Sequence, residues 1–176
     1  MKMKFITVCF FSVLVAGSAY AAKNDANLAT LKTAFETLAD ASGKNMKLTF
    51  TDKEYTFIYY ASNASEECRK FTPELIKFYG ENKKSASIEI IFLSLDKTEK
   101  EMTEQIKAMS IPFPIVDYKE IAKSGITKFA GQELPSLILL DKEGNIVADC
   151  YEGKKYMGPG KVLDKFKEIM STVGYD

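Results

Sequence analysis

The sequence contains no histidine and no tryptophan among its 176 residues. Without histidine, the chain cannot build His-ligated zinc sites, Ser-His-Asp triads or imidazole-based proton transfer. Positive charge is not concentrated either: no cluster of basic residues marks a nucleic-acid or membrane-surface partner. The sequence therefore predicts no metal site, no cofactor and no nucleic-acid partner.

Cysteine is scarce, and one of the three cysteines, Cys9, lies in a segment typical of a secretory signal peptide. Lys2 and Lys4 precede an apolar run from Phe5 to about Gly17, and Ala19-Tyr20-Ala21 forms an A-x-A cleavage site. The run is too short to span a bilayer, which needs about 20 residues. We expect an exported protein, periplasmic or secreted, with no membrane attachment once residues 1–21 are removed.

The expected mature chain is small and nearly neutral. Removal of residues 1–21 takes away two lysines and no acid, so 22 basic residues face 24 acidic ones, a net charge of −2. The remaining residues, about 155, are enough for one domain with its own core, and we take a monomer as the default. Two cysteines remain, Cys68 and Cys150, in a compartment where disulfides persist.

Hydrophobic spacing predicts alternating helices and strands. Helices are predicted at 24–41, 66–79, 98–109, 118–126 and after Pro159; strands are predicted at 46–51, 54–61 and 87–96, with a hairpin of strands 136–140 and 145–151. This order indicates an α/β fold whose central sheet has a parallel core, an antiparallel edge and helices on both faces.

Two segments of the sequence resemble one family. YYASNASEECRKFTPELIKFY (59–79) resembles the active-site region of the tryparedoxin and nucleoredoxin branch of the thioredoxin superfamily, which reads F-S-A-S-W-C-P-P-C-R-x-F-T-P-x-L. FAGQELPSLILLDKEGNIV (129–147) is similar to the G-x-x-I-P-T-L-V-L-L-D-x-x-G-x-x-V segment of that branch. The resemblance implies a thioredoxin-like domain at 46–176, preceded by a helical extension at 22–45.

The resemblance places Cys68 at the second cysteine of the family's C-x-x-C motif. Ser65 stands where the family has the first, attacking cysteine, and Ala64 stands where it has tryptophan. Glu66 and Glu67 occupy the two positions between the cysteines. An alcohol is barely ionised, and no histidine is present to activate it, so Ser65 cannot replace an attacking thiolate. The usual dithiol cycle, in which a second thiol resolves a mixed disulfide, is therefore expected to be absent.

A second part of the site is implied by Leu134, Pro135 and Ser136. Leu134-Pro135 matches the family's cis-proline segment, which lies against the thiols and contacts the backbone of bound substrates. Together with Ala64, Glu66 and Glu67, these residues are expected to form a groove for an extended peptide or protein.

Two interpretations of Cys68 remain open. In the first, Ser65 caps a helix whose first turn carries Glu66 and Glu67, Cys68 is a sheltered thiol, and the protein is a peptide-binding module without redox cycling. In the second, the protein is a thiol-disulfide oxidoreductase or a thiol peroxidase that uses Cys68 alone. Cys68 could also form a mixed disulfide with a partner. Peroxiredoxins have a similar S-x-x-C turn, but also a proline where this chain has Ala61.

Cys150 has no assigned role in either interpretation. It is predicted to lie near the end of the last strand as a stray surface or half-buried thiol. A disulfide requires two Cα atoms within about 7 Å. Because the edge strand is separated from the start of the 66–79 helix in this fold, we expect no disulfide between Cys68 and Cys150.

Overall fold

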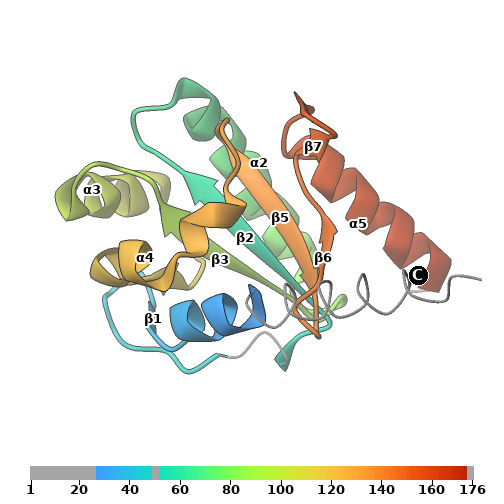
Figure 1. Cartoon of the computed structure of the whole chain (residues 1–176), viewed down its shortest axis with the longest axis horizontal. Coiled ribbons are helices and arrows are strands. Elements are labelled where there is room, and N and C mark those ends of the chain that lie inside the picture. Colours follow the sequence, from blue (N-terminus) through green and yellow to red (C-terminus); the bar gives the residue numbers. More distant parts are fainter. Residues whose placement is uncertain (1–26, 49–51, 174–176) are drawn as a thin grey trace, which may run out of the picture.

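The computed structural model describes residues 27–48 and 52–173, so the predicted signal peptide lies outside the described residues. These residues form a six-stranded sheet with helices on both faces and a separate two-stranded hairpin (Figure 1). The strands are β1 (Leu38–Ala39), β2 (Tyr55–Ala61), β3 (Ile88–Ser94), β4 (Ile115–Val116), β5 (Ser136–Asp141), β6 (Ile146–Ala148), β7 (Tyr151–Glu152) and β8 (Lys155–Tyr156). The helices are one at 27–35, α2 (Glu66–Asn82), α3 (Glu99–Met109), α4 (Tyr118–Ser124) and α5 (Gly160–Val173), with a 3-10 turn at Ile126–Phe129.

The sheet has the order β1-β4-β3-β2-β5-β6 and mixed strand directions. β2 lies between β3, to which it is parallel, and β5, to which it is antiparallel; Tyr59 pairs with Phe92 on one side and Leu137 on the other. β4 continues the parallel part, while β1 and β6 are antiparallel edge strands. The predicted α/β architecture with a parallel core and an antiparallel edge is confirmed.

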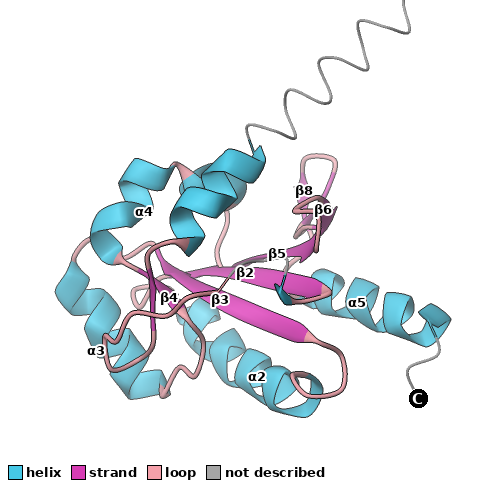
Figure 2. Cartoon of the chain, turned by 90° about the horizontal axis from the view of Figure 1, so that it is seen from below, coloured by secondary structure: helices cyan, strands magenta, loops and turns pink. Residues whose placement is uncertain are grey.

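Two hydrophobic cores lie on opposite faces of the sheet, because successive side chains of a strand point to opposite faces. Helices α2, α3 and α5 cover one face of the sheet (Figure 2). Phe57 and Tyr59 of β2 belong to the core on that face, and Ile58 and Tyr60 belong to the core on the other. All four side chains are fully buried, which explains the continuous apolar and aromatic sequence of this central strand.

The helix at 27–35 and α4 cover the second face. Leu31, Ala34 and Phe35 are buried against Ile58 and Tyr60 of β2, so this helix contributes to the core of the domain. The predicted helix over 24–41 is too long at its end. The chain leaves the helix after residue 35, and Leu38 and Ala39 pair with β4 as β1.

Two other predictions of secondary structure were wrong in detail, and one short strand was missed. The predicted strand 46–51 is not a strand at 46–48; the preceding residue, Asn45, forms an isolated bridge with Ala39. Residues 49–51 lie outside the described residues. The predicted strand 145–151 ends at Ala148, and a second hairpin, β7–β8, follows it. β4 was not predicted, since it has only two residues and directly follows Pro114.

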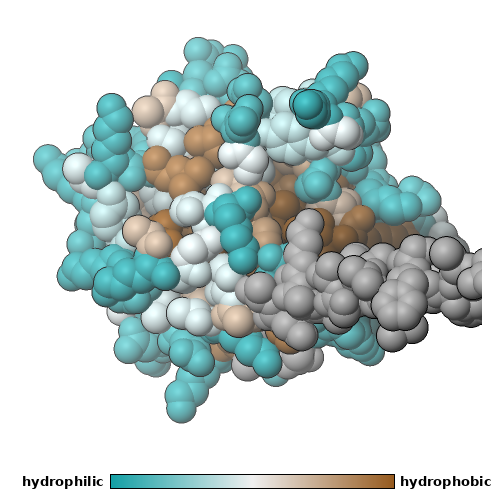
Figure 3. Space-filling model, in the orientation of Figure 1, coloured by the Kyte–Doolittle hydropathy of each residue, from teal (hydrophilic) through white to brown (hydrophobic). Residues whose placement is uncertain are grey.

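One edge of the sheet is partly uncovered. β6 is the edge strand beside β5, and Ile146 in it is 43% exposed. Figure 3 shows apolar surface over this region, bordered by hydrophilic side chains. A shallow cavity of about 620 Å³ lies between β6 and α5, lined by Val147, Met157 and Lys161 among others.

Candidate functional site

The loop between β2 and α2 is fixed by a buried carboxylate, Asp96. Asp96 lies two residues after the end of β3 and is 8% exposed. Its Oδ1 accepts hydrogen bonds from Ser62 Oγ at 2.8 Å and from the Asn63 backbone N–H at 2.7 Å, and its Oδ2 accepts one from Ser94 Oγ at 2.8 Å. A buried carboxylate needs such donors, and these donors tie the loop to the end of β3.

Ser65 is the N-cap of α2. Its backbone is extended, and its Oγ accepts a hydrogen bond of 3.2 Å from the backbone N–H of Cys68. Glu66 and Glu67 follow in the first turn, where carboxylates stabilise the positive end of a helix. Glu66 also forms an ion pair with Lys70 at 2.6 Å. Ser65 therefore has a structural role as a helix cap.

Cys68 is fully buried beneath this turn. Its backbone carbonyl accepts hydrogen bonds from Thr72 Oγ1 at 2.7 Å and from the Tyr59 hydroxyl at 3.4 Å. Burial raises the pKa of the Cys68 thiol above its usual value, and the charges of Asp96 and Glu67 add to the increase. Hydrogen bonds with Ser65 and the backbone of Ser62 oppose this increase without reversing it. The thiol is therefore mainly protonated at neutral pH.

The peptide bond between Leu134 and Pro135 is cis, as the resemblance implies. Pro135 is buried and Leu134 is half-buried, while Ser136 begins β5 and pairs with Tyr60 of β2. The Pro135 carbonyl accepts a hydrogen bond of 2.5 Å from the Tyr156 hydroxyl.

Tyr156 is the partly buried residue whose hydroxyl binds the proline segment. Burial raises the pKa of Tyr156, and negative charge at Cys150 or Cys68 would raise it further. The hydroxyl is therefore protonated at neutral pH and remains a hydrogen-bond donor.

Of the remaining predicted site residues, Ala64, Glu66 and Glu67 are exposed around the start of α2.

Cys150 is fully buried, so its description as a surface or half-buried thiol was wrong. Its Sγ accepts a hydrogen bond from the Leu137 N–H at 3.1 Å and donates one to the Leu137 carbonyl at 3.3 Å. The thiol thus takes the place of a strand partner just after β6 ends. Burial raises its pKa to about 11. Both Cys68 and Cys150 are free thiols, as expected.

Replacing Cys150 with alanine is expected to lower the free energy of unfolding by roughly 2 kcal/mol, because it leaves the buried N–H and C=O of Leu137 without a partner. Cys150→Ser keeps a donor and an acceptor at this position and should cost less. Urea denaturation of the two variants and the wild type measures the difference. Equal stability of Cys150→Ala and wild type would show that the two hydrogen bonds contribute nothing.

Sequence reasoning missed Asp96, Tyr151 and Tyr156. Asp96 could have been found, because β3 is a predicted strand parallel to β2, and the carboxyl ends of parallel strands meet at one edge of the sheet. The hydroxyls of Tyr151 and Tyr156 form hydrogen bonds with the backbone of the loop before β5, about 20 residues earlier in the sequence. No local sequence pattern indicates such contacts.

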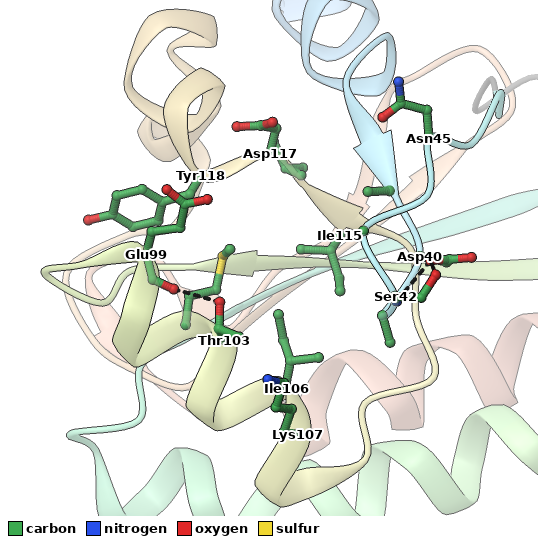
Figure 4. A pocket seen from close by; sticks show the side chains of 15 residues that line it. Asp40, Ser42, Asn45, Glu99, Thr103, Ile106, Lys107, Ile115, Asp117 and Tyr118 are labelled. Carbon is green, nitrogen blue, oxygen red and sulfur yellow. Dashed lines mark hydrogen bonds between the residues drawn. The ribbon is translucent and has the colours of Figure 1, made fainter.

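A cavity of about 380 Å³ lies elsewhere, at the β1 edge of the sheet. It is lined by the turn after β1, by α3 and by the start of α4, with Asp40, Glu99 and Tyr118 around it (Figure 4). None of the predicted site residues lines it. Among residues 27–48 and 52–173, no group of three or more metal-ligating side chains is present, and no helix is long and apolar enough to cross a membrane.

The mixed sheet, the helix that begins with Ser65 at its N-cap and the cis-proline beside it define a thioredoxin-like α/β fold. Tryparedoxin II from C. fasciculata has this fold, with a TM-score of 0.60 and 20% identity over 69% of this chain and 83% of that chain. The family model described as Thioredoxin-like matches residues 52–146, and the chain belongs to this family.

Curated relatives of the chain include a nucleoredoxin, a thiol-disulfide oxidoreductase and a tryparedoxin. The chain is 31% identical to nucleoredoxin of Danio rerio over 102 residues, 56% of this chain and 24% of that protein. It is 26% identical to the thiol-disulfide oxidoreductase ResA of Halalkalibacterium halodurans over 110 residues, 62% of this chain and 61% of that protein. It is 25% identical to tryparedoxin of Trypanosoma brucei brucei over 88 residues, 49% of this chain and 60% of that protein. The chain thus covers less than two thirds of each of these relatives.

Proposed function

We propose that this chain is an exported thioredoxin-like protein that binds an extended peptide or protein and does not run a dithiol redox cycle. The observation that carries the proposal is the hydrogen bond between Ser65 Oγ and the Cys68 N–H. This bond makes Ser65 a helix cap at the position where the family has its attacking thiol. A serine at this position provides no thiolate, and a C-x-x-C disulfide cannot form.

The state of Cys68 supports the same proposal. A reactive cysteine is partly exposed and has a lowered pKa, whereas Cys68 is fully buried and its pKa is raised. The positive end of α2 and Arg69 do not reverse this effect. The Arg69 guanidinium donates to the Asn63 carbonyl, on the exposed side of the turn.

The binding part of the proposal depends on the edge formed by Leu134 and Pro135. These residues directly precede Ser136, which pairs with Tyr60 near the end of β2, the strand that leads into α2. We therefore expect an extended chain to approach them from the side of Ala64. Glu66 and Glu67 are exposed in the first turn of α2. Backbone pairing of this kind uses the N–H and C=O groups of the partner, so it does not require an ionisable side chain on the partner.

The second candidate function is a thiol-disulfide oxidoreductase or peroxidase that uses Cys68 alone. The name of the relative ResA favours it. In that case the thiolate of Cys68 would attack a disulfide or a peroxide, and another thiol would be needed to release the product.

The rate at which iodoacetamide alkylates Cys68 in the folded mature protein distinguishes the two functions. At neutral pH we expect Cys68 to react at least about tenfold more slowly than in the urea-unfolded chain, which is the effect of one unit of pKa on the thiolate population. Because the pKa is raised, the rate should begin to increase only at a pH above the range in which the unfolded thiol titrates. Mass spectrometry of the labelled peptides separates Cys68 from Cys150.

Fast labelling of folded Cys68 with an apparent pKa below the free value of about 8.5, together with fast reaction with peroxide, would instead favour the single-thiol enzyme.

A further inference from the structure

The β7–β8 hairpin (Tyr151–Glu152 and Lys155–Tyr156) lies beyond residues 52–146, where the family model matches. The hairpin is anchored at its base on three sides. Cys150 binds the backbone of Leu137 in β5, the Met157 N–H donates to the Cys150 carbonyl at 2.8 Å, and Lys161 Nζ in α5 donates to the Tyr151 carbonyl. The two tyrosines that begin and end the hairpin are therefore held in fixed places.

Tyr151 holds the loop that precedes the cis-proline. Its hydroxyl oxygen accepts hydrogen bonds from the backbone N–H of Gln132 at 2.9 Å and of Glu133 at 3.0 Å. Its ring covers Gly131, which has a φ of 75°. A Cβ atom at Gly131 would lie only 2.6 Å from the Tyr151 ring, so the close approach requires glycine.

Tyr156 holds the other end of the same loop. Its hydroxyl donates to the Pro135 carbonyl at 2.5 Å, and its raised pKa keeps this donor protonated. The rings of Tyr151 and Tyr156 pack edge to face with centroids 5.5 Å apart, so the two hydroxyls act from one rigid unit.

We propose that Tyr151 and Tyr156 are positioning residues that set the partner-binding edge of this protein. The three hydrogen bonds occupy the N–H groups of Gln132 and Glu133 and the carbonyl of Pro135. The backbone N–H and C=O of Leu134 have no hydrogen-bond partner among the described residues. Within residues 132–135, Leu134 is thus the residue whose backbone N–H and C=O are both open to a partner. An extended peptide chain therefore pairs with Leu134 through both groups, and the hairpin determines where that pairing occurs; this inference rests on the proposed binding function.

Site-resolved amide exchange of the unliganded protein tests the hairpin directly. In Tyr151→Phe, which removes only the hydroxyl, we expect the Gln132 and Glu133 amides to exchange about tenfold faster, the factor that corresponds to one hydrogen bond. Amides of β2 and β3 should keep their wild-type exchange rates. Lys154→Ala, at the exposed tip of the hairpin, is the matched control and should change none of these amides.

A kinetic readout separates positioning from a general loss of structure. In a Ser65→Cys background, we expect Tyr156→Phe to raise the KM for insulin severalfold while kcat changes by less than about twofold. Wild-type exchange at Gln132 and Glu133 in Tyr151→Phe would overturn the inference, as would an unchanged KM in Tyr156→Phe. Failure of the proposed function would look different: the wild-type chain itself would reduce insulin, whatever the exchange rates of the loop.

Discussion

Ser65→Cys is expected to give this protein an insulin-reducing activity that the wild type lacks. The protein has Cys68 at the start of α2 and a cis peptide bond before Pro135, so under the proposed function the variant supplies the attacking sulfur that a dithiol cycle needs. A free cysteine is already a few per cent thiolate at neutral pH, and the positive end of a helix lowers the pKa further. The new thiol would occupy the exposed rim of the turn, because Ser65 is only partly buried.

The restored cycle has two exchange steps. The thiolate introduced at position 65 attacks an insulin disulfide, forms a mixed disulfide and releases one insulin thiolate. The Cys68 thiolate then attacks the introduced sulfur, releases the second insulin thiolate and leaves an internal disulfide, which dithiothreitol reduces. The burial of Cys68 suits it to this second, intramolecular step, in which the target sulfur lies on the same turn.

The measurement is turbidity from precipitating insulin B chain, with dithiothreitol as the electron donor. We expect the rate with Ser65→Cys to exceed that with dithiothreitol alone by at least about tenfold, since the variant supplies thiolate where the wild type has an alcohol. Ser65→Ala, which adds no thiol, is the matched control and should remain at background. If Ser65→Cys is folded but as inactive as Ser65→Ala, a thiol at position 65 is not sufficient for the dithiol cycle, and the prediction is wrong.

Phe166→Ala is expected to have the largest effect on stability, a loss of about 3–5 kcal/mol. Phe166 lies on α5, is 1% exposed, and contacts three aromatic rings edge to face, with centroid distances of 5.7 Å to Tyr55, 5.3 Å to Phe57 and 5.6 Å to Phe78. Removing the ring leaves a cavity between α5, β2 and α2 that rigid neighbours cannot fill. Because Lys161 on the same helix binds the Tyr151 carbonyl, the β7–β8 hairpin should also loosen.

Chemical denaturation followed by circular dichroism measures this loss. Lys167→Ala, one position along α5, removes only an exposed ion pair with Asp164 and should change stability by less than about 1 kcal/mol. A loss below about 1 kcal/mol for Phe166→Ala would mean that α5 does not close this core as the contacts indicate.

The sequence predicted those elements whose signals are local. The continuous aromatic run of β2 and the Ser65 cap of α2 both depend on neighbours within a few residues, and both are present in the structure. The helix end at residue 35 and the strand β1 depend on pairing with β4, about 77 residues later, so helical periodicity alone placed the boundary too late.

The same distinction applies to the site. The positions of Ser65, Cys68 and Pro135 follow from short motifs, whereas Asp96 acts on a loop 33 residues earlier in the chain. Cys150 is predicted to be a surface or half-buried thiol near the end of a strand over 145–151. The strand instead ends at Ala148, and the chain then turns the thiol inward against the backbone of Leu137. Contacts of this kind need the tertiary structure.

The mass of the folded wild-type chain after equilibration with excess oxidised glutathione tests the central claim most directly. For residues 22–176 the account predicts an unchanged mass, because no thiol pair can form a disulfide at the start of α2 and the two thiols of the described residues, Cys68 and Cys150, are buried. A loss of two hydrogen atoms that dithiothreitol reverses, repeated over several cycles, would contradict it.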